Sequence, residues 1–310
     1  MPSAVVAANS APLRGMAEVL AAVPVEHLVG RFALLVPAAM RRVGRESMLR
    51  SSVFLREVEW THSGHCEEEW SGWLQRLAAR RPPPGVREAI VEQREIAPGC
   101  RAVLAHESEY DRDVRTWFAL QNEGTHGVWL ECAQEPRTPH RALFKLATVA
   151  RSYLTLDAQN RLQPQEWFYL ERGAVALPPL GEEEFFVQFD GYPLDVRLEL
   201  SSKVAAAPDP EGGLMARLQR AVALGFQEDM KVEILRAGSR IVAGLDGEEL
   251  IFQVESERDK HVSWGWWCPG RPGNARAPRV ELTLHSTHHE QDAKTLLWDA
   301  SLDSVRYLRP

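Results

Sequence analysis

Apolar side chains recur at helical spacing in several segments of the chain, at positions i, i+3, i+4 and i+7 of a 3.6-residue period. Each such segment predicts an amphipathic helix with one face toward a core. The positions that carry these helices are Met16, Val19, Leu20 and Val23; Trp70, Trp73, Leu74 and Leu77; Leu143, Leu146, Ala147 and Ala150; Leu214, Leu218 and Val222; and Ala293, Leu296, Leu297 and Ala300.

Other segments have a period of two. Apolar residues alternate with polar ones from Leu194 to Leu200 and from Val280 to Leu284. This pattern predicts antiparallel strands with one buried face and one solvated face. Asp246-Gly247 stands between two apolar runs, and a type I′ turn prefers this dipeptide because both of its central residues need a positive φ. We therefore predict a hairpin that turns at these two residues.

The predicted elements follow a similar order in the two halves of the chain. We therefore predict an α+β fold of two related domains, residues 1–160 and 161–310, each a mostly antiparallel sheet packed with helices. The boundary is expected between Asp157 and Pro164. The expected ranges are Gly30–Pro37, Glu67–Arg80, Val91–Leu104, Trp117–Cys132 and Arg141–Leu154, then Phe185–Leu200, Gly213–Leu224, Val232–Val254, Val262–Leu284 and Gln291–Leu302.

Composition narrows the class of protein. The 310 residues are 45% hydrophobic and 25% charged, and the net charge is −7. A negative balance argues against a nucleic-acid binder and fits a protein that docks on a basic partner. The four cysteines form no CxxC pair, so neither a zinc ribbon nor a disulfide framework is indicated, although one or two bridges stay possible in an exported protein.

Targeting signals are not visible in the sequence. The first residues have no positively charged region before a short apolar run, and no stretch of about 18 apolar residues occurs. Taken literally, the sequence predicts a cytoplasmic chain that does not span a membrane.

Catalytic and metal-binding motifs are absent from the sequence. It contains no nucleophile elbow, phosphate-binding loop, dinucleotide fingerprint, HExxH helix or EF-hand loop. His62, His65 and Cys66 could ligate zinc but lack a further ligand pair, so a helix start with incidental histidines is favoured there. The polar cluster from His285 to Asp292 favours a solvated turn, with a metal or general-base site as the alternative. We predict no catalytic residue, metal or cofactor.

Three tryptophans stand in the segment Ser263–Cys268. On a strand, Trp264 and Trp266 share one face and Trp267 takes the other, so core packing is favoured over a sugar-stacking platform or a partner hot spot. The acidic runs at residues 67–69 and 182–184 are expected to be solvated, and the second could meet a basic patch on a partner.

Several short segments, in their order and spacing, together resemble a known family. They are Ala243–Glu249, the aromatic strand ending in Cys268-Pro-Gly, Pro278–Leu284, Val29–Pro37, Trp167–Val175 and Glu182–Phe186. With these segments the chain resembles the immunity proteins that neutralise the fourth family of type VI secreted lipase effectors. The resemblance implies a two-domain α+β inhibitor without enzymatic activity, which binds a cognate phospholipase effector and blocks its lid opening or its access to lipid. It also implies a periplasmic location.

A binding role predicts an interface of about 1,600 Å² or more with aromatic or arginine anchors. From turn chemistry, we expect five exposed hairpin and loop positions to contribute to it: Asp246, Glu248, Glu249, Arg271 and Asn274. Two other functions stay open. One is a carbohydrate- or envelope-binding module with Trp264 and Trp266 exposed, and the other is an enzyme of an unrecognised class that uses paired acidic residues. The oligomeric state is also left open.

Overall fold

The structure is a computed structural model that describes residues 15–50, 52–157, 165–179, 181–191, 195–223, 230–256 and 259–308. Its main feature within these residues is a 12-stranded sheet in which all neighbouring strands are antiparallel. In spatial order the strands are β14 (Lys231–Val242), β15 (Leu245–Glu255), β16 (Lys260–Cys268), β17 (Arg279–Thr287), β13 (Val196–Lys203), β12 (Glu184–Asp190), β3 (Arg41–Leu49), β4 (Val53–Glu59), β8 (His126–Gln134), β7 (Arg115–Asn122), β6 (Cys100–His106) and β5 (Ile90–Ala97).

Two three-stranded sheets accompany the large one. The first has the order β1 (Pro24–Val29), β2 (Phe32–Pro37) and β18 (Arg306–Tyr307), and the second has the order β10 (Phe168–Tyr169), β11 (Gly173–Val175) and β9 (Tyr153–Thr155). The chain's last described strand therefore pairs with one of its first. In the large sheet, β12 pairs with β3, so strands from both halves of the chain lie side by side there.

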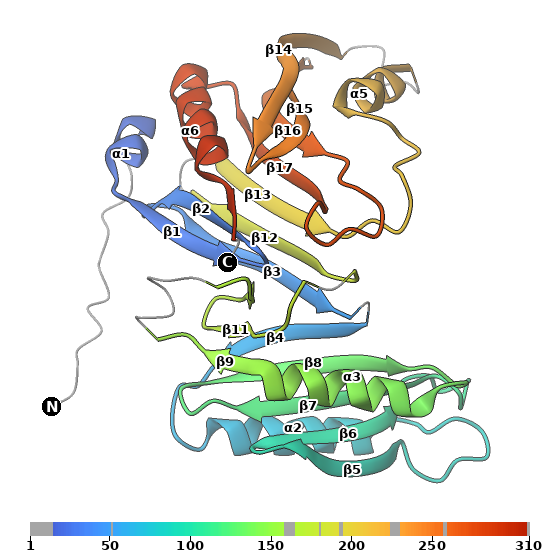
Figure 1. The fold of residues 1–310 in the computed structure, drawn as a ribbon. Coiled ribbons are helices and arrows are strands. Elements are labelled where there is room, and N and C mark those ends of the chain that lie inside the picture. Colours follow the sequence, from blue (N-terminus) through green and yellow to red (C-terminus); the bar gives the residue numbers. More distant parts are fainter. Residues whose placement is uncertain are drawn as a thin grey trace, which may run out of the picture.

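Helices lie on both faces of the large sheet (Figure 1). They are α1 (Met16–Ala21), α2 (His65–Ala78), α3 (Pro139–Ser152), α5 (Leu214–Ala223) and α6 (Gln291–Ser304). Apolar side chains of α1, α3 and α6 join the main hydrophobic core, whereas α2 packs into a separate cluster on the opposite face. We call the face with α3 and α6 the covered face.

The structure confirms the predicted α+β class and mostly antiparallel sheets. Helices α2, α3, α5 and α6 lie within a few residues of their expected ranges, and α1 begins at Met16 but ends before Val23, which is 77% exposed. Residues 158–164, which contain most of the expected domain boundary, and Leu194 lie outside the described residues. The division into residues 1–160 and 161–310 stays a prediction.

The predicted hairpin turn at Asp246-Gly247 is wrong by three residues. Strands β14 and β15 do form a hairpin, but it turns at Ala243 and Gly244, whose φ values are 54° and 75°. Asp246 and Gly247 lie within β15. A Cβ on Gly247 would lie 2.5 Å from the Trp266 ring, so this glycine makes room for an indole across the sheet instead of bending the chain.

The tryptophan strand β16 lies in the core, as predicted. Trp264 is 0% exposed and Trp266 is 1% exposed, and their indole N–H groups donate to Thr295 Oγ1 and to the carbonyl oxygen of Arg240. Because both rings are buried and hydrogen-bonded, they offer no flat surface to a sugar. The alternative of a carbohydrate- or envelope-binding module with Trp264 and Trp266 exposed is therefore wrong.

Arg31 joins segments that are distant in sequence. It forms a buried ion pair with Glu183, and all three of its guanidinium nitrogens donate hydrogen bonds. Its guanidinium donates from Nε to Glu183 Oε2 at 2.9 Å and from a terminal nitrogen to Glu183 Oε1 at 2.5 Å. The other terminal nitrogen donates to the carbonyl oxygens of Glu166 and Leu177. Each partner is more than 130 residues away in sequence, so this pair fixes tertiary rather than local structure.

Glu57 is the centre of a second buried network. Its carboxylate accepts hydrogen bonds from the backbone N–H groups of Glu171 and Arg172 and from the Tyr153 hydroxyl, which lies 2.7 Å from Oε1. The Tyr153 hydroxyl donates its hydrogen bond to Glu57. Its oxygen therefore accepts a hydrogen bond from Nε2 of His126, which is also 2.7 Å away. The network holds the segment around residue 171 against β4 and β8.

Candidate functional site

The face opposite α3 and α6 is partly uncovered within the described residues. Helix α2 packs on β6, β7 and β8 at one end, and α5 contacts β15 and β16 at the other, with Arg217 4.7 Å from the Trp267 ring centre. In between, buried positions alternate with exposed or half-buried ones along β4, β12, β13 and β17. Because the buried set belongs to the main core, the alternate set forms a solvated surface, which we call the open face.

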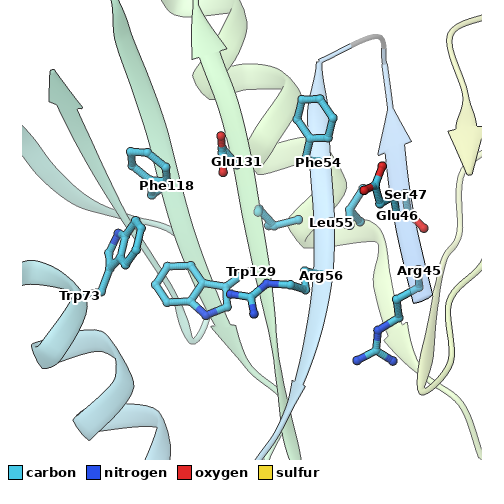
Figure 2. A pocket seen from close by; sticks show the side chains of 11 residues that line it. Arg45, Glu46, Ser47, Phe54, Leu55, Arg56, Trp73, Phe118, Trp129 and Glu131 are labelled. Carbon is cyan, nitrogen blue, oxygen red and sulfur yellow. The ribbon is translucent and has the colours of Figure 1, made fainter. Parts of the chain in front are cut away.

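A groove of about 400 Å³ lies on the open face where it meets α2. Figure 2 shows its side chains, which come from β3, β4, β7, β8 and α2. Aromatic rings form its apolar part: Phe54, Trp73, Phe118 and Trp129. Such a combination of apolar lining and nearby charged groups is typical of a binding surface.

The aromatic rings of the groove pack closely on one another. The Trp73 ring lies edge-on to Phe118 at 5.3 Å and to Trp129 at 5.4 Å between centroids. Phe118 and Trp129 are 4% and 7% exposed, so they form a fixed floor. Phe54, in contrast, is 53% exposed, although it stands in the middle of a sheet. An exposed aromatic beside a rigid aromatic floor is a suitable anchor for a protein partner.

Charged side chains border this floor. Arg56, on β4, lies beside the Trp129 ring in Figure 2 and forms no ion pair with any described residue. Glu131, on β8, lies toward the other end, and burial together with the neighbouring Glu107 raises the pKa of its carboxyl, which Arg80 and Arg56 oppose. The groove is therefore basic near Arg56 and acidic near Glu131, which would orient a partner segment of opposite polarity.

Two of the expected interface residues border a second depression. Asp246 and Glu248 lie with Ile241 and Trp267 around a space of about 510 Å³ on the β14–β15 hairpin. Asp246 is exposed and Glu248 is half-buried. One carboxylate oxygen of Glu248 is buried without a hydrogen-bond partner in the described part of the chain.

Glu249 does not have the expected exposure. It is 7% exposed and accepts hydrogen bonds from Arg236, Arg240 and the Trp298 indole, all at 2.6 to 2.9 Å. The side chains of β15 alternate between faces, so Glu249 points to the covered face whereas Glu248 points away from it. Its contacts hold α6 on the sheet, which is a structural role.

Arg271 and Asn274 are exposed, as expected, in the loop between β16 and β17. The loop is ordered by its own backbone, because the Arg271 N–H donates to the carbonyl oxygen of Ala277 and the Asn274 N–H donates to that of Arg271. The structure therefore does not bring the five expected residues to one surface. Their part in an interface stays a prediction.

The histidine clusters form no metal site within the described residues, where no group of three or more His, Cys, Asp or Glu side chains could hold an ion. The His62 and His65 rings stack at 5.3 Å, and Nδ1 of His65 accepts the backbone N–H of Thr61 at 3.1 Å. All four cysteines are free and buried. Burial raises the pKa of the Cys100 thiol to about 12, so it stays protonated.

The groove was not recognised in the sequence. Its side chains come from five elements, and only the alternation of Val53, Leu55 and Glu57 with Phe54 and Arg56 could have indicated a strand there. That alternation places Phe54 and Arg56 together on the polar side of a strand, and this is the sequence feature that could have indicated a binding surface there.

Solved structures of low sequence identity share this fold over nearly the whole chain. The apo structure of the immunity protein TplEi of the type VI secretion system from Pseudomonas aeruginosa has a TM-score of 0.77 and 16% identity, covering 92% of this chain and 97% of that one. The Tle4–Tli4 complex gives a chain with a TM-score of 0.77, 15% identity and the same coverage. TplEi complexed with an "L" peptide has a TM-score of 0.72 and 15% identity, covering 93% and 99%.

The protein is thus an α+β protein with the fold of type VI secretion immunity proteins and an open sheet face that bears an aromatic groove. Residues 168–310 match the family described as the Tle cognate immunity protein 4 C-terminal domain. This is the family that the sequence resemblance indicated. Comparison with curated proteins gives no match. In the described residues, no helix is both long and apolar enough to cross a membrane.

Proposed function

We propose that this protein is the immunity partner of a type VI secreted phospholipase effector, which it inhibits by binding. The observation that supports this most is the fold, which extends over more than nine-tenths of the chain and is shared with an immunity protein solved together with Tle4. The family match over residues 168–310 supports the same assignment from the sequence.

We further propose that the open face, including its groove, is the effector-binding surface. A single exposed aromatic, Phe54, stands beside a floor of packed rings, and Arg56 and Glu131 supply charges of opposite sign at its two ends. A partner segment seated there would bury the Phe54 ring, which is the kind of contact that carries much of a binding energy. Inhibition would then follow if the bound effector cannot open its lid or reach lipid.

The proposal includes a role without catalysis and a periplasmic site of action. The described residues offer no group of possible metal ligands, and the two carboxylates that line the groove, Glu46 and Glu131, come from different strands. An immunity protein acts by occupying its target, so it needs surface complementarity instead of a reactive centre.

The first experiment is co-expression with a candidate cognate phospholipase effector. The chain should relieve toxicity, co-purify with the lipase and suppress hydrolysis of a phospholipid substrate. If the chain neither relieves toxicity nor forms a complex with the lipase, the immunity role is refuted. Hydrolysis by the purified chain alone would instead favour an enzyme.

The docking surface is tested separately with two matched phenylalanines. Phe54→Ala removes the ring from the open face and should weaken effector binding about tenfold or more. Phe144 on α3 is 64% exposed but lies on the other side of the sheet, so Phe144→Ala should leave affinity unchanged. Isothermal titration calorimetry gives both affinities. Equal affinities for the two variants would place the interface elsewhere while leaving the immunity role intact.

A further inference from the structure

Another cavity lies on the covered face of the large sheet, away from the open face. It has a volume of about 310 Å³ and lies where β1, β3 and residues 170–172 meet. Val25, Leu28 and Leu170 give it apolar walls, while Arg42 and Arg172 are among its charged side chains. In the sheet, Arg42 is the register partner of Phe189, a fully buried core residue, and this places Arg42 on the covered face.

Arg42 is half-buried and has no acidic side chain in direct contact with it. Its Nε is inaccessible to solvent and has no hydrogen-bond acceptor, and its guanidinium forms no hydrogen bond or ion pair with the described residues. Arg31, eleven positions earlier, is held by a carboxylate and two carbonyl oxygens. A half-buried guanidinium that lines a cavity and has no acidic partner is available to a ligand that enters the cavity.

The acidic groups near Arg42 are already engaged by other partners. The Glu57 carboxylate accepts the Tyr153 hydroxyl and two backbone N–H groups. Glu171 is hydrogen-bonded to Arg45, and Glu26 is hydrogen-bonded to Arg306 at 2.7 Å. Burial lowers the pKa of Arg42, and Glu171 opposes that shift from a distance whereas Arg45 adds to it. The site thus holds a positive charge that its own acids do not meet by direct contact.

We propose that this cavity binds an oxyanion, a carboxylate or a phosphate group, through the guanidinium of Arg42. The planar guanidinium matches both groups because it can donate two parallel hydrogen bonds to two oxygens. The apolar walls would contact the aliphatic part of the molecule that carries the anion. The cavity is of a size that holds a small ligand or one acidic side chain. The proposal does not depend on the effector.

Thermal unfolding in different anions tests the site. The melting temperature of the wild-type protein is measured in sodium chloride, sodium phosphate and sodium acetate at equal ionic strength and pH. Binding to the folded state should raise it by several degrees in phosphate, in acetate or in both, relative to chloride. A rise in phosphate alone assigns the site to phosphate, and a rise in acetate alone assigns it to a carboxylate.

The variant Arg42→Met removes the charge and keeps an unbranched apolar side chain. In chloride it should melt no lower than the wild type, because Arg42 makes no hydrogen bond or ion pair with the described residues that the substitution would remove. It should also lose the rise caused by the anion. Arg197→Met is the matched control, since Arg197 is exposed on β13, and it should retain that rise.

Two results would overturn the proposal. The first is a wild-type melting temperature that is the same in all three anions, together with no heat of binding when inorganic phosphate or acetate is titrated into the wild type. The second is an Arg42→Met protein that melts well below the wild type in chloride, which would give Arg42 a structural role. If Arg42→Met does not fold, Arg42→Gln replaces it in the melting experiments. The titrations of phosphate and acetate into the wild type then show whether the anion binds.

Discussion

The two faces of the large sheet use their polar side chains in opposite ways. On the covered face, Arg31 and Glu57 are buried and make several hydrogen bonds each, to groups more than 90 residues away in sequence. On the open face, Arg56 is exposed and forms no ion pair with any described residue, and Phe54 projects into solvent. Arg31 and Glu57 on the covered face therefore have their hydrogen-bonding groups satisfied within the chain, whereas Arg56 on the open face has no ion-pair partner among the described residues.

This difference follows from where the chain's connections run. The small sheets, α6 and the segment near residue 171 all lie against the covered face, so their backbone groups need acceptors and donors there. Arg31 and Glu57 supply these groups from the large sheet and its neighbour. Within the described residues, the helices on the open face are α2 and α5 alone. The side chains of its strands therefore have fewer backbone groups beside them that need a hydrogen-bond partner.

The largest effect is expected from breaking the Arg31 pair. Arg31→Met removes two charge-assisted hydrogen bonds from the buried Glu183 carboxylate and one hydrogen bond from each of two carbonyl oxygens, so the free energy of unfolding should fall by about 3–5 kcal/mol. Urea unfolding followed by circular dichroism measures this change. Arg306→Met, which breaks an exposed pair with Glu26, should cost at most about 1 kcal/mol. Equal losses for the two variants would mean that the covered face does not depend on its saturated network.

The next effect concerns the Glu57 network. Tyr153→Phe removes the hydroxyl that donates to Glu57 and accepts from His126, leaving a buried donor unpaired at a cost of about 1–3 kcal/mol in unfolding free energy. The same unfolding assay applies. The control Tyr110→Phe should show no measurable change, because Tyr110 is 82% exposed. A Tyr153→Phe protein as stable as the wild type would show that water replaces the hydroxyl without loss.

A smaller effect is expected from pH. Burial lowers the pKa of His126, with Arg172 adding to the shift while Glu57 and Glu123 oppose it. The unfolded chain then binds a proton more readily than the folded one below the ordinary histidine pKa of about 6.5. Stability should therefore fall as the pH decreases through that value, and level off once His126 is protonated in both states.

The His126 contribution is isolated by a variant. His126→Gln should have lower stability at pH 7.5 but a shallower decline between pH 7.5 and 5.5 than the wild type, measured by urea unfolding at each pH. This interval lies above the range in which the carboxyls of Asp209 and Asp299 titrate, since the pKa of each is lowered. Parallel declines for the two proteins would exclude His126 as the source.

Elements with strong local patterns could be predicted from the sequence, and this explains which expectations held. Helices α2, α3 and α6 have apolar faces at helical spacing, and β17 alternates, so their ranges were close. The hairpin turn failed because Gly247 is a glycine for a tertiary reason, the nearby Trp266 ring, which no local rule contains. Residues 243 and 244 adopt the positive φ values instead.

The candidate site was harder to predict than the fold. Turn chemistry identified Asp246 and Glu248 as surface positions, but it also selected Glu249, whose partners Arg236, Arg240 and Trp298 come from β14 and α6. The groove needs Phe54 beside Trp73, Phe118 and Trp129, and these residues are brought together only by the strand order β4, β8, β7 with α2 across it. Long-range pairing of this kind leaves little trace in one sequence.

The smallest change in stability should come from the open face itself. Phe54→Ala removes a ring that is 53% exposed, so the unfolding free energy should change by no more than about 0.5 kcal/mol. Phe118 belongs to the aromatic floor of the groove and is 4% exposed. Phe118→Ala should therefore lower the unfolding free energy by about 3–5 kcal/mol in the same assay. A large loss for Phe54→Ala would mean that its ring supports the fold. Its weakened effector binding could then no longer be ascribed to a lost contact, and the distinction between the two faces would fail where it matters most.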